Sequence, residues 1–250
     1  QTFRRVWTER ESKISTFEPR PSLADTNHLV HNGNFYEIKW DKVVLWDEPD
    51  GFSCSEGTYS SYAGRSDRDP HFFVTHWDAA LSSSSCAKIM KKRGLSVHFC
   101  IDNDGTIFQT LDTQHAAWQA GSRSWNHDSI GVEISNAYYP KYQEWYVKQG
   151  LGERPVMSGV KCHGSKMKDF LGFYDVQIDA LAALYEAINR KLGIPLESPT
   201  DSMGRHVETI SPAAASGRFA GFVSHYHLTK RKIDCAGLDL VDVCRRAKNV

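Results

Sequence analysis

The run Phe72-Phe73-Val74-Thr75-His76 decides the fold of this 250-residue chain. Aromatic and β-branched residues in succession are typical of a strand that is buried on both faces of a sheet. His76 ends this apolar run, so it is also the first candidate for a chemical role.

Alternating helices and strands are predicted on the C-terminal side of this strand. Gly94 and Gly193 are expected to end helices, and Asn103-Asp104-Gly105 is a strong signal for a hairpin turn. The predicted elements are a helix over 82–94, strands over 97–101, 106–109 and 130–134, a helix over 175–193, and a short helix over 240–247. This order predicts an α/β fold with a mixed central sheet flanked by helices.

The remaining segments are predicted to decorate that domain. Residues 1–65 are interpreted as an N-terminal extension packed on a main domain of residues 66–250. Within the extension, 35–40 and 42–46 are expected to pair as a hairpin. Residues 137–173 are interpreted as a long inserted loop, because this segment is irregular and carries several glycines and lysines.

Composition excludes several function classes. Lys plus Arg and Asp plus Glu each total 30, so a neutral chain has no global electrostatic reason to bind nucleic acid or an anionic membrane. No apolar run approaches the roughly 20 residues needed to span a bilayer, and the first five residues lack the apolar core of a signal peptide. The six cysteines form no CxxC pair, which argues against a thiolate zinc knuckle. Free thiols and at least one disulfide both stay open as alternatives.

Two histidines and an aspartate are the candidate metal ligands. His225 follows a second apolar run, and Asp234 follows shortly after it. Two imidazoles and one carboxylate make a usual catalytic zinc set, with a fourth position left for water. The chain has 11 histidines, and His76 lies too far from His225 for a local zinc motif, so an ordinary hydrogen-bonded histidine remains the alternative at each position.

Five ordered segments resemble the type 2 N-acetylmuramoyl-L-alanine amidases. This family includes cell-wall recycling amidases, phage amidase-type lysozymes and animal peptidoglycan recognition proteins. The segments are FVTHW at 73–77, KRGLSVHF through DNDGTI at 92–107, AWQAG at 117–121, NHDSIGVEI at 126–134, and SHYH through KID at 224–234. The likeness covers about 70–136 and 175–245, and it leaves out the extension and the inserted loop.

The resemblance implies a function and a set of site residues. The implied reaction is zinc-dependent hydrolysis of the amide between N-acetylmuramic acid and L-alanine in peptidoglycan or muropeptides. One Zn²⁺ would be held by His76, His225 and Asp234, with Glu133 and Lys232 as catalytic groups. The positions implied to line the substrate groove are His98, Trp118 and Asn126.

Each assigned role has an alternative that the sequence leaves open. Glu133 could face solvent, Lys232 lies in a basic run, Trp118 could be a packing residue, and His98 could be a core histidine. Cys235 could compete with Asp234 as a ligand. At the level of function, the alternatives are a protein that binds peptidoglycan without cutting it, and a zinc amidase for another amide whose groove is reshaped by 137–173.

The chain departs from the family pattern at several positions near the site. His227 replaces an aspartate, where it could accept a hydrogen bond or bind metal. Gln119 replaces the usual histidine of AWHAG, Val97 stands where some phage members have a tyrosine, and Cys235-Ala236 replaces Pro-Gly. A monomer with an extracellular or periplasmic location is expected, and a cytoplasmic recycling enzyme is the alternative.

Overall fold

A six-stranded mixed sheet forms the centre of the molecule. The computed structural model describes residues 27–65 and 67–250. All neighbouring strands of this sheet run parallel except β6 and β7. Across the sheet the order is β14 (Gly221–Ser224), β5 (Phe72–Trp77), β9 (Ser129–Ile134), β6 (Phe99–Ile101), β7 (Ile107–Gln109) and β3 (Val43–Leu45).

The quoted strand β5 is buried on both of its faces, as its composition predicts. Successive side chains of a strand point to opposite faces. Phe73 packs edge-on against Tyr185 of the helix behind the sheet, whereas Phe72 and Val74 belong to a separate apolar cluster on the other face. The same alternation places His76 on the face of Phe72 and Val74.

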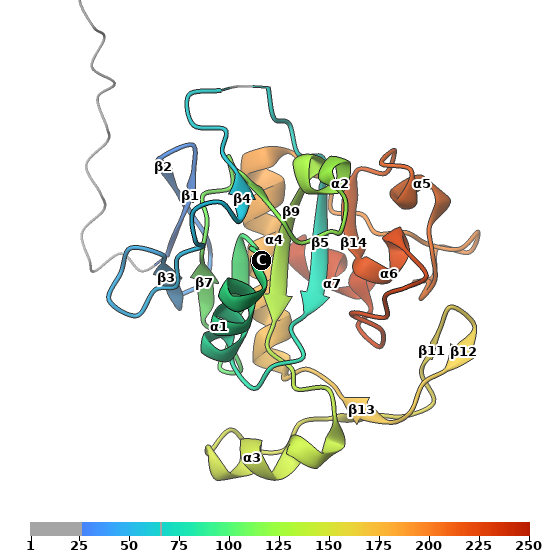
Figure 1. Ribbon diagram of the computed structural model, residues 1–250. Helices are drawn as coiled ribbons and strands as arrows, with labels where there is room; N and C mark the ends of the chain where they lie inside the picture. The colour runs from blue at the N-terminus through green and yellow to red at the C-terminus, as the bar shows by residue number, and fades with distance from the viewer. Residues whose placement is uncertain (1–26, 66) are drawn as a thin grey trace, which may run out of the picture.

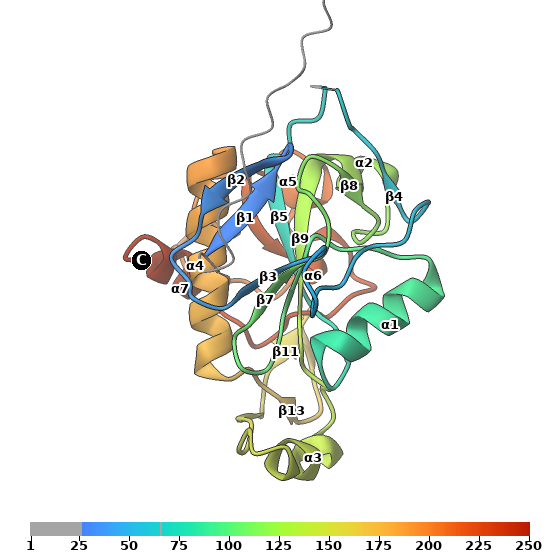
Figure 2. The ribbon, with the colours of Figure 1, turned by 90° about the vertical axis from the view of Figure 1, so that its left-hand side faces the viewer.

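Helices cover both faces of the sheet, which confirms the predicted fold class. Helices α4 (Asp175–Leu192) and α7 (Leu240–Ala247) lie on one side, and α1 (Ser83–Arg93) lies on the other (Figure 2). The Ser82 hydroxyl caps α1 by accepting from the Ser85 amide, and Gly94 ends α1 in the left-handed conformation. Both helix ends therefore follow the predicted signals.

The N-terminal region joins the main sheet, and its predicted hairpin is wrong. Strand β2 (Asn34–Glu37) pairs with β1 (His28–His31) instead of with the segment that follows it. Strand β3 pairs in parallel with β7, where Val43 and Leu45 become buried. The segment described from residue 27 to 65 thus supplies an edge strand as well as packing on the domain. Residues 1–26 of the predicted extension lie outside the described residues.

The inserted segment 137–173 lies below the main sheet in Figure 1. It contains the 3-10 turn η1 (Pro140–Tyr142), helix α3 (Gln143–Lys148), and two small ribbons, β10 (Val156–Met157) with β13 (Phe170–Leu171) and β11 (Lys161–Cys162) with β12 (Ser165–Lys166). The buried Arg154 guanidinium lies over the rings of Tyr146 and Tyr174, and its Nη2 donates to the Ser135 carbonyl of the main domain. Such contacts anchor the insertion to the domain.

Several short elements lie outside the main sheet. They are β4 (Tyr59–Ser60), β8 (Ala116–Ala117), α2 (Arg123–Asp128), α5 (Pro212–Ala215) and α6 (His225–Leu228). All six cysteines fall within the described residues and are free thiols. Over the described part of the chain, no helix is both long and apolar enough to cross a membrane.

Candidate active site

Neighbouring strands bring the two candidate histidines together. Strands β14 and β5 are parallel, and Ser224 pairs with Thr75. His225 follows Ser224, and His76 follows Thr75. The two histidines are therefore neighbours, and their ring centroids lie 4.7 Å apart. The 149-residue separation that obscures the pair in the sequence is thus closed by strand register.

Asp234 completes a tight group of three possible ligands. One ligand atom from each residue lies within 4.8 Å of the others. Asp234 Oδ2 is 2.9 Å from His76 Nδ1 and 3.2 Å from His225 Nδ1. Burial alone would raise the pKa of Asp234, but the two imidazoles beside it outweigh burial and hold this pKa well below its usual range.

Unpaired buried atoms indicate that this group suits a cation. His225 Nδ1 approaches Asp234 without forming a hydrogen bond, and it has no other partner among the described residues. Burial lowers the pKa of His225, which favours the neutral imidazole that a metal requires. Buried polar atoms are rarely left without partners, and two imidazole nitrogens with one carboxylate oxygen fit zinc.

Glu133 lies beside this group on the adjacent strand. It pairs with His76 across β5 and β9, and its neighbours Val132 and Ile134 face the apolar core on the other side of the sheet. Its Oε2 is buried with no partner among residues 27–65 and 67–250. Burial raises the pKa of Glu133 to about 8, whereas a divalent cation nearby would favour the ionised form. The buried Oε2 beside the ligand group favours the catalytic interpretation over a solvent-facing glutamate.

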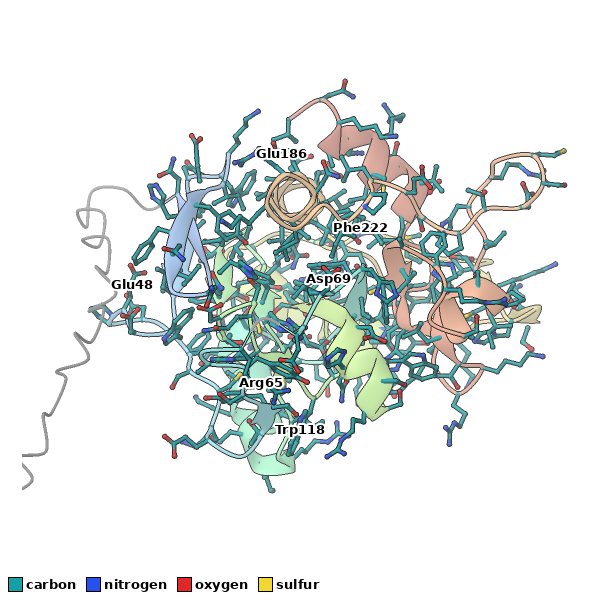
Figure 3. The ribbon with its side chains drawn as sticks, turned by 90° about the horizontal axis from the view of Figure 1, so that it is seen from above. Glu48, Arg65, Asp69, Trp118, Glu186 and Phe222 are labelled. Carbon is teal, nitrogen blue, oxygen red and sulfur yellow. The ribbon has the colours of Figure 1, made fainter. Side chains whose placement is uncertain are left out.

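A groove of about 1150 Å³ opens beside the ligand group. The ligand His225 lines it together with Lys232, Trp118 and Asn126. Figure 3 shows Trp118 and Arg65, another lining residue, on the side of the molecule opposite Glu186 of α4. The volume is ample for an extended ligand.

Trp118 and Asn126 already form hydrogen bonds within the protein. Trp118 is 37% exposed, and its indole Nε1 donates to Ser60 Oγ. The Asn126 carbonyl oxygen accepts from the backbone amides of Gln119 and Ala120. Only the Nδ2 group of Asn126 is thus left for a ligand.

His98 lies beneath the groove and does not line it. Its side chain is fully buried, Nε2 donates to the His115 carbonyl, and Nδ1 accepts from the Gly131 amide. Burial lowers the pKa of His98 to about 3. The core interpretation of His98 fits these contacts, and the predicted direct contact with substrate does not.

Two departures from the family pattern serve structural roles. His227 Nδ1 accepts from the Ser224 amide, and its Nε2 donates to the Val207 carbonyl. His227 is therefore a hydrogen-bonded substitute for the aspartate, with neither ring nitrogen free for metal. Cys235 packs in the apolar cluster shared with α4, so Asp234 alone of this pair points to the histidines.

Sequence reasoning missed two groups that contact the site. Gln119 forms a hydrogen bond with His76 Nε2, although the sequence marked it only as a departure from AWHAG. His163 of the insertion donates to the Lys232 carbonyl, and no local pattern signals this contact. None of the described residues that line the groove comes from 137–173, so the insertion does not reshape this groove directly.

Comparisons with known proteins agree with the predicted family. The family model described as N-acetylmuramoyl-L-alanine amidase matches residues 66–234, which is more than half of the chain. No curated protein sequence matches the chain.

Similar solved structures include three bacterial and phage proteins. AmiA of Staphylococcus aureus is 15% identical with a TM-score of 0.46, over 82% of each chain. LysC of Clostridium intestinale is 15% identical with a TM-score of 0.46, over 84% of this chain and 98% of that one. The endolysin of Thermus scotoductus bacteriophage Ph2119 is 16% identical with a TM-score of 0.45, over 82% and 99%.

The family match confirms the enzyme class that the five sequence segments predicted. The chain belongs to the N-acetylmuramoyl-L-alanine amidase family, whose reaction is the hydrolysis of amide bonds in peptidoglycan.

Proposed function

We propose that this protein cleaves the amide between N-acetylmuramic acid and L-alanine with one Zn²⁺ held by His76, His225 and Asp234. The observation that carries the proposal is the convergence of these three side chains, with a buried His225 Nδ1 that has no hydrogen-bond partner among the described residues. All three ligands come from one chain, so a monomer suffices.

The reaction then needs an acid, a base and a stabilised oxyanion. A zinc ion bound there would supply Lewis acidity toward water and the amide carbonyl. Glu133 is the general base: its unpaired Oε2 takes a proton from the attacking water and later gives it to the leaving amine of L-alanine. Lys232, which lines the groove together with His225, provides a positive charge for the oxyanion of the tetrahedral intermediate.

Substrate binding is assigned to the groove beside the ligands. The exposed face of Trp118 provides an apolar surface for a sugar ring or for the peptide stem. Asn126 Nδ2 provides a donor for an amide carbonyl of the stem. His98 is left out of this assignment because it is fully buried.

Digestion of purified muropeptides and intact sacculi by the zinc-loaded protein tests this function. Mass spectrometry is expected to detect free stem peptides that begin with L-alanine. Tight muropeptide binding without release would favour the recognition-protein alternative, and cleavage at another amide would favour the third interpretation. Activity on sacculi would fit an extracellular or periplasmic enzyme, and activity restricted to soluble fragments would fit a recycling enzyme.

A further inference from the structure

Gln119 joins the ligand His76 to the neighbouring strand through both ends of its amide. Its Oε1 lies within hydrogen-bond distance of His76 Nε2, and its Nε2 donates to Ser129 Oγ at 2.9 Å. The Gln119 backbone amide donates to Asn126 Oδ1. The side chain is therefore held at its base and at both atoms of its tip.

Gly131 of β9 makes the space for this side chain. A Cβ at position 131 would lie 2.3 Å from Gln119 Oε1 and 2.5 Å from Gln119 Cδ, far inside van der Waals contact. The Gly131 amide donates to the buried His98, which fixes the backbone at this point. Any side chain at 131 would displace the Gln119 amide from His76.

The orientation of the amide determines which nitrogen of His76 carries the proton. A carbonyl oxygen only accepts hydrogen bonds, so the His76 Nε2 that faces it must donate. In the neutral imidazole, Nδ1 is then left with a lone pair. Asp234 Oδ2 lies 2.9 Å from this nitrogen. Without a metal this contact needs a proton on Nδ1, whereas a bound cation would take the place of that proton and be shared by the Nδ1 lone pair and the carboxylate.

We propose that Gln119 is a positioning residue that holds His76 in the Nε2–H tautomer and so presents Nδ1 to the metal. This inference rests on the proposed zinc site. Metal-bound histidines usually donate their other ring N–H to an orienting acceptor. In this chain Gln119 would be that acceptor, and Gly131 leaves the space for its side chain.

Zinc affinity of three variants tests the proposal. Competition against a chelating dye is expected to give about 10- to 100-fold weaker binding for Gln119→Leu, which keeps the bulk and removes the acceptor. Gln119→Glu keeps an acceptor at this position and is expected to bind zinc at least as tightly as the parent protein. Equal affinity of Gln119→Leu and the parent would overturn the proposal.

The His76→Ala variant separates this proposal from the proposed function. Loss of zinc binding in His76→Ala with unchanged affinity in Gln119→Leu would overturn the role of Gln119 alone. Retention of tight zinc binding in His76→Ala would instead overturn the zinc site itself.

A double-mutant cycle with Gly131→Ala distinguishes positioning from general destabilisation. Gly131→Ala is expected to weaken zinc binding when Gln119 is present and to have little effect in a Gln119→Ala background, where the collision is absent. Equal effects in both backgrounds would contradict the proposal.

Nitrogen-15 NMR of the zinc-loaded protein gives a readout that does not depend on activity. His76 is expected to carry its proton on Nε2 and the metal on Nδ1 in the parent, and to be a mixture of the two arrangements in Gln119→Leu, whereas His98 is expected to keep its Nε2–H signal in both, because it donates to the His115 carbonyl. An unchanged His76 spectrum in Gln119→Leu would count against the proposal.

Discussion

The site has two halves that are held in place by different means. The strand half consists of His76 and Glu133, which pair with each other on adjacent central strands. The loop half consists of His225, Lys232 and Asp234, which lie on a one-turn helix and the loop after it. Strand pairing within the sheet positions the strand half. In the loop half, strand pairing ends at Ser224, immediately before His225 at the start of α6.

The insertion supports the loop half from outside the groove. His163, at the turn of the β11–β12 ribbon, donates to the Lys232 carbonyl, and its own amide donates to the Glu208 carbonyl. Cys162 belongs to the same small apolar cluster as Tyr226 and Ala236. The insertion therefore packs against the loop of Lys232 and Asp234, although it contributes no lining residue to the groove. Site residues on a loop need such supporting contacts to hold their positions.

Removing the carboxylate of the loop half is expected to have the largest effect. Asp234→Ala leaves two buried imidazoles without the oxygen that they share, so stoichiometric zinc binding and stem-peptide release should both fall below detection. Metal analysis after dialysis measures the first, and mass spectrometry the second. Full zinc occupancy in Asp234→Ala would mean that the two halves do not share one ion.

Replacing the base of the strand half should separate chemistry from metal binding. Glu133→Gln keeps the shape of the side chain and removes its basicity, so turnover should fall by roughly 100- to 10,000-fold. Zinc content should match that of the parent protein, unlike in Asp234→Ala. Near-normal turnover in Glu133→Gln would remove Glu133 from the mechanism.

His98 beneath the strand half should make stability depend on pH. Its folded pKa is about 3, against about 6.5 for an ordinary histidine, so below pH 6.5 the unfolded chain binds a proton that the folded chain does not. Its contribution to the free energy of unfolding is full above pH 6.5 and is lost as the pH falls toward 3, by up to about 1.4 kcal/mol per pH unit.

Denaturant unfolding of the parent and of His98→Gln between pH 7 and pH 4 measures this contribution. His98→Gln should be less stable at pH 7 by about 1–3 kcal/mol, because two buried hydrogen bonds are disturbed. The difference should shrink as the pH falls, since glutamine does not titrate. Two parallel stability curves would show that His98 is not held neutral in the fold.

The smallest effect is expected where the insertion contacts the loop half. His163→Ala removes one hydrogen bond to a backbone carbonyl, worth about 0.5–1.5 kcal/mol, so turnover should fall by only about 2- to 10-fold. His163→Gln, which keeps a donor, serves as the matched control. A loss in His163→Ala as large as that in Glu133→Gln would mean that this contact does more than support the loop.

The two halves also differ in how far the sequence predicts them. The strands around 72–76 and 130–134 follow from local composition, and the pairing of these strands then places His76 beside Glu133. The apolar run before His225 makes it and Asp234 no more than candidates, and only the family resemblance selects them as ligands. The hairpin at 97–109 and the ends of α1 also follow from local sequence signals. The order of these local elements is enough to predict the fold class.

What the sequence did not predict depends on contacts between distant residues. Strand β3 pairs with β7, more than 60 residues further along the chain, so its pattern alone suggested a hairpin with its neighbour. The ribbons of the insertion have strands of two residues, too short for any periodicity. The contact between Gln119 and His76 likewise spans 43 residues and depends on a glycine in a third segment.

The metal's coordination tests the account most directly. A crystal of the zinc-loaded protein, measured at the zinc absorption edge, is expected to show one ion per chain with the Nδ1 atoms of His76 and His225 and an oxygen of Asp234 at about 2.0–2.2 Å. An ion bound by other residues, or no ion at saturating zinc, would contradict the proposal that the two halves meet at one metal.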